Sequence, residues 1–328
     1  MVKWLSDSWY RLHPIRWLLM PFSLLYRWVS AIRRLAYQHD WLTRHKMNVP
    51  VIVVGNISVG GTGKTPFVLW LCEQLKQAGF KPGIISRGYG GKAKHYPLDV
   101  SHSTSTAEAG DEPVLIARRS GCPVVVDPDR SQAAIHLLSQ RDCDVIISDD
   151  GLQHYALQRD VEICLVDSQR RFGNKLCLPA GPLREPLSRL QSVDFVVYHG
   201  QTSTSNYQMQ LMAQQWHNLA MPEQHLPLSA FSGQEVHAVA GIGHPQRFFD
   251  LLCQHDIIVH PHAFDDHHDF KASDLEFADA LPVLMTEKDA VKCQLFAQAH
   301  HWYLPVTAHV DDGLAQAILN KLKDPADG

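Results

Sequence analysis

Short apolar runs alternate with amphipathic stretches of helical length through residues 47–200. The runs are rich in Val and Ile and are bounded by Gly, Pro and Asp, which is typical of buried strands. Stretches between several of them carry apolar residues at helical spacing. The strands are expected at 51–54, 84–86, 123–127, 144–149, 161–167 and 193–198, and helices at 66–75, 111–117 and 131–139. This alternation predicts an α/β fold with a doubly wound, mostly parallel sheet.

The composition changes after residue 200. Residues 201–232 are rich in Gln, Ser, Thr and Asn, and they predict a connector with one or two strands. Strands at 236–240, 257–259, 281–285 and 302–306, with helices at 245–252 and 272–280, then predict a second, smaller α/β domain. A mobile Ser/Thr-rich loop is expected at 92–107. The predicted regions are an N-terminal segment (1–46), a nucleotide-binding domain (47–200), the connector (201–232) and a C-terminal domain (233–328).

The first predicted strand leads into a glycine-rich loop with the chemistry of a phosphate site. Glycines let backbone N–H groups face phosphate oxygens, and the following helix adds positive potential at its first turn. Lys64 is expected to neutralise the outer phosphates, and Thr65 to bind Mg²⁺. Ser58 stands where a first glycine is usual, and Val59 where partition-type ATPases usually have lysine. Strand, loop and helix together predict a P-loop NTPase-like domain that binds a nucleoside triphosphate through Ser58, Gly60, Gly61, Thr62, Gly63, Lys64 and Thr65.

Chemically capable residues follow two other predicted strands. Ligands of open parallel sheets bind at the carboxyl ends of the strands. Arg87 and Tyr89 follow the strand at 84–86, so both are candidate site residues. Asp149 and Asp150 end the strand at 144–149, where phosphate-loop enzymes keep the acid that orders Mg²⁺ or its water.

Three further charged residues begin a helix or lie in a constrained loop. The loop at 178–186 contains three prolines, which fix its shape and direct Arg184 and Glu185. Asp111 begins a predicted helix, where an aspartate commonly serves as the N-cap. From the residues alone, capping and catalysis both remain open for Asp111.

The N-terminal segment interleaves aromatic residues with arginines and has little acid. Its longest uncharged run, residues 17–26, is about half of the roughly 20 residues that a spanning helix needs, and Pro21 interrupts it. The segment also lacks a small-residue secretory cleavage site. An amphipathic helix in the membrane interface fits this pattern. The alternative is a helix packed on its own domain with its arginines facing solvent.

Composition narrows the function classes. The chain has 328 residues, is 45% hydrophobic and 20% charged, and carries a net charge of −4, which does not indicate a globally basic nucleic-acid binder. Its 7 cysteines form no C-x-x-C pair, so reduced, buried thiols are expected. His260, His262, His267 and His268 lack the spacing of a permanent metal site, and an acid–base role for a histidine is favoured.

Eight motifs in this order resemble the tetraacyldisaccharide 4′-kinase family of lipid A biosynthesis. They are the loop at 60–66, Ser86-Arg87-Gly88-Tyr89-Gly90, Gly110-Asp111-Glu112-Pro113, residues 149–154, residues 179–186, residues 240–243, residues 264–268 and Thr286-Glu287-Lys288-Asp289. The resemblance covers nearly the whole chain. Asp265 departs from it, since the family often has proline there.

The resemblance implies ATP- and Mg²⁺-dependent transfer of the γ-phosphoryl group to the 4′-hydroxyl of a tetraacyldisaccharide 1-phosphate, giving the 1,4′-bisphosphate. It implies a peripheral enzyme on the cytoplasmic face of the bacterial inner membrane, with a glycolipid substrate and no nucleic-acid partner. Asp111 would be the base, His267 its partner, and Lys64 the cation on the β- and γ-phosphates. Thr65, Asp150 and Glu185 would arrange Mg²⁺, Asp149 and Arg184 would support it, and Arg87 and Tyr89 would contact the sugar or its 1-phosphate.

Two other classes are compatible with a phosphate loop. A membrane-associated switch ATPase of the partition type also pairs such a loop with an amphipathic helix, but Val59 argues against it. A phosphate-loop kinase for a soluble metabolite is the second alternative, and the N-terminal segment argues against that one.

Overall fold

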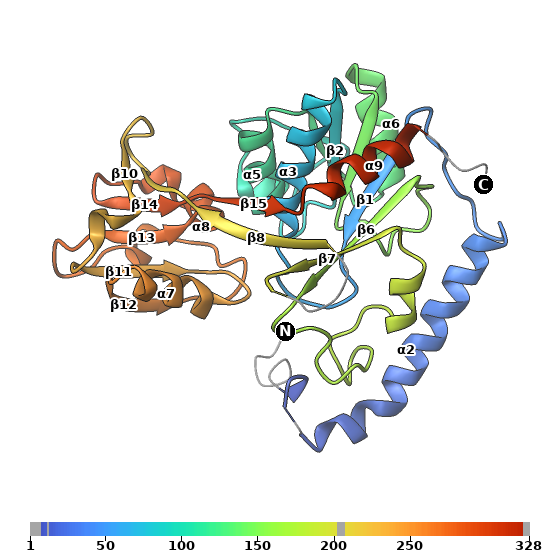
Figure 1. Cartoon of the computed structure of the whole chain (residues 1–328), viewed down its shortest axis with the longest axis horizontal. Helices are drawn as coiled ribbons and strands as arrows, with labels where there is room; N and C mark the ends of the chain where they lie inside the picture. The colour runs from blue at the N-terminus through green and yellow to red at the C-terminus, as the bar shows by residue number, and fades with distance from the viewer. Residues whose placement is uncertain (1–7, 12, 202–206, 324–328) are drawn as a thin grey trace.

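The computed structural model describes residues 8–11, 13–201 and 207–323. The start of the N-terminal segment and residues 202–206 of the expected connector lie outside the described residues. Two sheets of different size form two lobes, joined where β8 and β15 run between them (Figure 1). The predicted α/β class, with a doubly wound, mostly parallel sheet and a smaller second α/β unit, is confirmed.

The larger lobe is built on a nine-stranded sheet. Neighbouring strands from β8 to β4 pair in parallel, while β15 on one edge and β3 on the other are antiparallel. The order is β15 (Val306–Val310), β8 (Tyr207–Ala213), β7 (Phe195–His199), β6 (Val161–Asp167), β1 (Val51–Gly55), β5 (Val145–Asp149), β2 (Pro82–Ser86), β4 (Val124–Val126) and β3 (Leu98–Val100).

Alternate residues of each central strand bury their side chains in different cores. In β1, Ile52 and Val54 belong to one hydrophobic cluster, and Val51 and Val53 to the other, because side chains alternate along a strand. The first cluster is covered by α3 (Lys64–Gln77), α5 (Asp111–Ser120) and α9 (Gly313–Lys323), and the second by α6 (Arg130–Gln140) and η1 (Leu187–Gln191). The short α4 (Thr106–Ala109) precedes α5.

The smaller lobe is built on a six-stranded sheet. The order is β10 (His225–Pro227), β9 (Gln215–Asn218), β14 (His301–Leu304), β13 (Val283–Thr286), β11 (Glu235–Ala240) and β12 (Ile258–Ala263). Helix α7 (Pro245–Gln254) packs on one face and α8 (Glu287–Cys293) on the other. Short 3₁₀ turns complete the lobe at η2 (Leu228–Phe231), η3 (Ala272–Asp274) and η4 (Gln294–Phe296).

The chain crosses between the lobes more than once. Strand β8, from the expected connector, joins the larger sheet, whereas β9 and β10 join the smaller one. Strand β15 and helix α9 then return to the larger lobe. The division at residues 200 and 232 stays a prediction, and sheet membership does not follow it. Composition signals a polar stretch, but strand partners decide which sheet receives it.

Three predicted elements differ from the structure. The helix expected at 272–280 is only the turn η3, because Leu275 is buried and Phe277 stacks on His237, so the segment follows the core instead of a helical path. The strand expected at 257–259 extends through β12, paired along β11. The loop expected at 92–107 contains β3, which pairs with β4. The cysteines are free, and all but Cys253 are buried.

Helix α2 (Ile15–Gln38) runs along the outside of the larger lobe, as the long blue helix of Figure 1. Only Ser23 and Ala36 of this helix are buried. Its exposed apolar face consists of Trp17, Leu18, Phe22, Leu24, Leu25, Trp28, Val29, Ile32 and Leu35. None of the helices in the described part of the chain has the length and apolarity to cross a membrane.

Candidate active site

The glycine-rich loop connects β1 to α3 as predicted. Gly60 and Gly63 have φ values of 118° and 85°, a region that favours glycine. Gly63 is the N-cap of α3, and a Cβ there would lie 2.7 Å from Cε of Met209 on β8. The loop conformation therefore requires glycine at position 63. The amino end of α3, which carries positive potential, faces the loop.

Two contacts hold the loop in place. The side-chain amide of Asn56 donates to the Gly60 carbonyl and to the Thr62 hydroxyl, both at 3.3 Å. Ser58 is buried and forms a β-bridge with Leu183 of the proline-rich loop. The phosphate loop is thus held by Asn56, at its start, and by Leu183, more than a hundred residues further along the chain.

Lys64, Asp150 and Arg184 form a charged group beside the phosphate loop. Nζ of Lys64 lies 3.7 Å from Oδ1 of Asp150, and Nη1 of Arg184 donates to both carboxylate oxygens at 3.2 and 3.0 Å. Burial by itself raises the pKa of Asp150, but Lys64 and Arg184 outweigh it and lower the pKa to about 2. Asp150 is therefore ionised at neutral pH.

Asp149 differs from its neighbour although both follow the same strand. Its side chain is buried, Oδ2 accepts a hydrogen bond from the Ser86 hydroxyl at 3.2 Å, and Oδ1 has no hydrogen-bond partner among the residues that the structure describes. Burial, with the nearby charges of Glu112 and Asp150, raises the pKa of Asp149. An unpaired oxygen in a buried carboxylate is a position that a cation or a water can satisfy.

The oxygen donors here fit Mg²⁺. Mg²⁺ prefers hard oxygen ligands and usually takes one or two carboxylates together with phosphate oxygens and waters. The Asp150 carboxylate, the unpaired oxygen of Asp149 and the Thr65 hydroxyl in the first turn of α3 are of this kind. A larger ligand cluster is not needed, and in the described ranges no group of three or more His, Cys, Asp or Glu side chains has a metal-binding arrangement.

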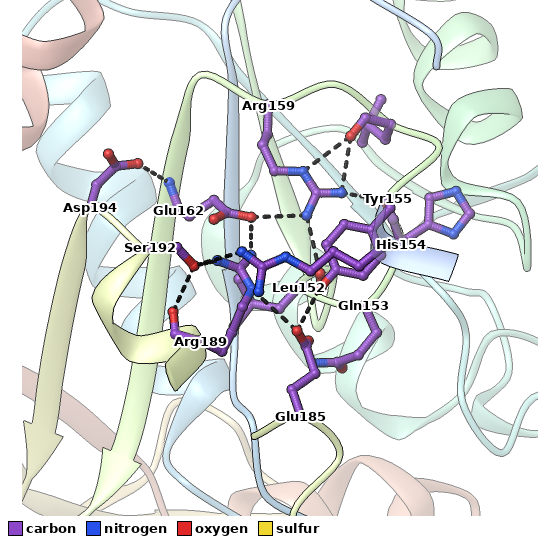
Figure 2. Close-up of polar contacts among 12 residues, drawn as sticks. Leu152, Gln153, His154, Tyr155, Arg159, Glu162, Glu185, Arg189, Ser192 and Asp194 are labelled. Carbon is purple, nitrogen blue, oxygen red and sulfur yellow. Dashed lines mark hydrogen bonds and ion pairs between the residues drawn. The ribbon is translucent and has the colours of Figure 1, made fainter. Parts of the chain in front are cut away.

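Glu185, also expected at the metal, is engaged elsewhere. Figure 2 shows its carboxylate surrounded by Gln153, Tyr155 and Arg189. Oε1 accepts from the Gln153 amide at 2.7 Å, while Oε2 accepts from the Tyr155 hydroxyl and lies 3.2 Å from Nε of Arg189. The metal-binding role of Glu185 stays a prediction. In the structure its carboxylate orients the loop that carries Gln153.

Arg189 and Arg159 join this carboxylate to strand β6. Arg189 is 2% exposed and pairs with Glu162 of β6, which also pairs with Arg159 at 3.0 Å. Arg159 donates to the carbonyls of Leu152 and His154, in the loop after Asp150 (Figure 2). This ionic chain links the two loops that flank Asp150 to the central sheet.

Asp111 and His267 meet across the lobes. Asp111 is the first residue of α5 in the larger lobe, and His267 follows β12 in the smaller lobe. Nδ1 of His267 lies 3.0 Å from both carboxylate oxygens of Asp111. Asp111 is not the N-cap, because Gly110 with φ 88° occupies that position, but Oδ1 of Asp111 accepts the backbone N–H of Glu112 at 2.9 Å in the first turn of the helix.

Each member of this pair shifts the pKa of the other toward the charged form. Burial by itself raises the pKa of Asp111, but the His267 hydrogen bond and the charge of Lys288 lower it below its usual range. Burial by itself lowers the pKa of His267, but Asp111 raises it above its usual range. The Asp111 carboxylate is therefore ionised at neutral pH, which is the protonation state that a base requires, and the imidazole fixes its orientation.

Arg87 and Tyr89 both follow β2, and Tyr89 lies against this pair. Both are exposed at the carboxyl end of β2, and the Tyr89 ring centroid lies 5.0 Å from that of His267. Arg130, which received no role from the sequence, is buried nearby and donates to the Asp150 carbonyl at 3.3 Å. Burial lowers its pKa to about 10.

The smaller lobe also reaches the phosphate loop. A Cβ on Gly243 would lie 3.2 Å from Oδ2 of Asp266 and 3.6 Å from the backbone nitrogen of Gly61. Of the remaining histidines, His260 and His262 lie on β12, and His268 pairs with Asp274. These histidines therefore have different partners, and among them His267 is the one that contacts Asp111.

Helix α2 contacts the same loops through its polar side. The Tyr26 hydroxyl donates to the Arg184 carbonyl at 3.0 Å, and Ser23 donates to the Cys177 carbonyl at 2.7 Å. Arg34 donates to the Ser192 hydroxyl at 3.0 Å. Helix α2 thus packs on its own domain, as the alternative expected, and Arg27 and Arg33 are exposed. The contacts with the protein come from the polar side, however, and the apolar face is exposed.

Asn56, Arg130 and Lys288 were not identified from the sequence as functional residues. Asn56 follows β1 directly, so its position could have suggested support for the loop. Lys288 belongs to a motif that carried the resemblance, but spacing along the chain does not reveal that it faces Asp111. Arg130 begins α6, and only the packing of α6 under Asp150 shows its position.

Comparisons with known proteins point to one family. The family model described as tetraacyldisaccharide-1-P 4′-kinase matches residues 15–323. A tetraacyldisaccharide 4′-kinase of Psychromonas ingrahamii is 54% identical over 318 residues, covering 96% of this chain and 98% of that protein. One of Methylobacillus flagellatus is 51% identical over 322 residues, covering 98% of this chain and 96% of that protein.

The fold comparison points the same way. The crystal structure of LpxK from Aquifex aeolicus in complex with ATP superposes with a TM-score of 0.79 and 32% identity. The match covers 94% of this chain and 99% of that chain. The chain therefore belongs to the tetraacyldisaccharide 4′-kinase family.

Proposed function

We propose that this protein transfers the γ-phosphoryl group of ATP to the 4′-hydroxyl of a tetraacyldisaccharide 1-phosphate, giving the 1,4′-bisphosphate. Family membership supports the substrate class. The observation that carries the chemistry is the pair of the buried Asp111 and the half-buried His267, which the two lobes contribute next to a phosphate loop. Neither the switch ATPase nor the soluble-metabolite kinase is supported by a feature of this site.

The proposed reaction needs a base, charge neutralisation and a fixed approach. Asp111 accepts the proton of the attacking hydroxyl, and His267 holds the carboxylate in place at 3.0 Å. Lys64 and the loop amides neutralise the outer phosphates. Thr65 and Asp150, with Asp149, would hold Mg²⁺, which would neutralise the negative charge on the phosphate groups during transfer.

The exposed apolar face of α2 is proposed to lie in a lipid surface, with the enzyme peripheral at the cytoplasmic face of the inner membrane. Aromatic and aliphatic residues occupy this face, while the polar residues Ser23, Tyr26 and Arg34 contact the protein. Because Tyr26 bonds to the Arg184 loop, the lipid-facing helix is connected to the site that receives the lipid sugar.

The experiment is incubation of purified protein with ATP labelled in the γ-phosphate and a purified tetraacyldisaccharide 1-phosphate. We expect label in a lipid product that a 4′-phosphatase removes, and loss of about 10²- to 10⁴-fold in rate for Asp111→Asn. A protein that hydrolyses ATP without labelling the lipid would contradict the proposal. If the Asp111→Asn variant labelled the lipid at the wild-type rate, the assignment of Asp111 as the base would be contradicted.

A further inference from the structure

Lys288 presents its ammonium group to carboxylates from both lobes. Its Nζ lies 3.2 Å from Oε1 of Glu112, 3.2 Å from Oδ1 of Asp266 and 3.8 Å from Oδ2 of Asp111. Glu112 and Asp111 begin α5 in the larger lobe, and Asp266 precedes His267 in the smaller one. A single cation therefore joins the start of α5 to the loop that supplies the histidine.

Lys292, one turn further along α8, supports the same arrangement. Residues four apart lie on one face of a helix, so Lys288 and Lys292 both face α5. Nζ of Lys292 lies 3.9 Å from Oδ2 of Asp111 and 2.8 Å from Oδ1 of Asp289. Asp289 in turn accepts the Gly241 N–H at 3.0 Å, in the loop that approaches the phosphate loop.

The charge state of the cluster is consistent with this geometry. Burial by itself lowers the pKa of Lys288, but Glu112, Asp111 and Asp266 raise it above its usual range, so the ammonium is charged at neutral pH. Asp111 has its pKa lowered against the effect of burial, by His267 first and then by Lys288. The lysine thus acts as a fixed positive charge beside the carboxylate.

We propose that Lys288 is a positioning residue for phosphoryl transfer: its ammonium holds the Asp111 carboxylate against the smaller lobe, so that the base is oriented when Asp266 and α8 are docked on α5. This inference rests on the proposed function, in which Asp111 takes the hydroxyl proton. It separates two tasks within the cluster. His267 bonds the carboxylate directly, and Lys288 fixes it relative to both lobes.

The test is the variant Lys288→Met, compared with a matched control at the adjacent residue. Glu287 also makes a charge pair between α8 and α5, with Arg119 at 2.7 Å, but it does not contact Asp111. Glu287→Gln therefore breaks an interlobe ion pair without touching the base. For Lys288→Met we expect kcat to fall by roughly 10- to 100-fold, as for a misplaced catalytic group, with the KM for ATP within about twofold. For Glu287→Gln we expect kcat within about twofold of wild type, since the lost pair does not involve Asp111 or its partners.

The pH profile distinguishes positioning from loss of fold. Removing the positive charge raises the pKa of Asp111, so the acid limb of kcat/KM moves to higher pH in Lys288→Met. Lys288→Arg keeps the charge, leaves the acid limb where it is and recovers part of kcat. The charged groups that face this cluster from α5, α8 and the loop after β12 are Asp111, Glu112, Asp266, His267, Asp289 and Lys292.

An unshifted acid limb together with a kcat equal to that of Glu287→Gln overturns the inference. Asp111→Asn is measured in parallel: if it remains active, the base assignment fails and the inference fails with it. If Asp111→Asn is inactive while Lys288→Met behaves like the control, only the inference fails. If circular dichroism shows that Lys288→Met does not fold, the Lys288→Arg variant is the test. It keeps the positive charge but moves it, so a wild-type kcat in Lys288→Arg would refute the positioning role.

Discussion

Replacing Trp28 by alanine tests whether the exposed face of α2 binds lipid. Trp28 is 66% exposed and points away from the contacts that hold α2 to the protein. Since a tryptophan side chain buries about 150–250 Å² when covered, roughly 130 Å² is available for transfer into the membrane interface. At about 25 cal/mol per Å² this corresponds to about 2–3 kcal/mol after allowing for the remaining methyl group.

The expected consequence is a roughly 30- to 150-fold weaker partition of Trp28→Ala onto lipid vesicles, because each 1.4 kcal/mol is a factor of ten. Co-sedimentation with vesicles of phosphatidylethanolamine and phosphatidylglycerol measures the partition constant. The KM for acceptor lipid should rise in parallel, whereas the KM for ATP should not change. Folding stability should stay within about 0.5 kcal/mol, since the side chain is not part of the core.

Leu295 provides the matched control. It is 99% exposed and lies on η4 of the smaller lobe, away from α2. Leu295→Ala removes exposed apolar surface without touching the proposed lipid face, so its partition constant should equal that of wild type. Equal partition of Trp28→Ala and wild type, or an equal loss in Leu295→Ala, would refute the reasoning.

Three further substitutions test the site. Gly63→Ala combines a positive φ of 85° with a Cβ 2.7 Å from Met209, so we expect weaker ATP binding by calorimetry and about 1–3 kcal/mol lower stability; unchanged binding would show that the loop tolerates a side chain. His267→Ala removes the hydrogen bond that lowers the pKa of Asp111, so kcat should fall far more than ATP affinity and the acid limb of kcat/KM should move to higher pH; activity lost only through unfolding, seen by circular dichroism, would argue against the role. Arg189→Met leaves the buried Glu185 without its cation, and Glu162 with Arg159 as its remaining partner, and should cost about 3–5 kcal/mol in urea unfolding; a loss below about 1 kcal/mol would mean that the ionic chain is not stabilising.

Local sequence signals predicted much of the larger lobe. The apolar run at 51–54 and the glycines after it specify a buried strand and a turn with positive φ, which depend on neighbours in the chain. The strands ending at Ser86, Asp149 and Asp167 were expected for the same reason. The helix expected at 272–280 failed because burial of Leu275 and stacking of Phe277 on His237 override helical propensity.

The residue types of the site were predicted more readily than their partners. Asp111, Lys64 and Asp150 could be found because each lies at a helix start or a strand end. The direction of Glu185 could not be found, because it depends on Arg189 and Tyr155 from other segments. Lys288 was hidden for the same reason, since its importance lies in facing Asp111 across the lobes.

The sequence by itself determined the phosphate loop, the alternating strands and helices, the aromatic and basic N-terminal segment, and a resemblance that family membership confirmed. These features depend on residues close together in the chain. Only the tertiary structure decided which sheet receives β8 and β15, which face of α2 is exposed and which charges surround Asp111. Those outcomes depend on strand pairing and on ion pairs between residues far apart in sequence, such as His267 and Asp111, and no local pattern encodes them.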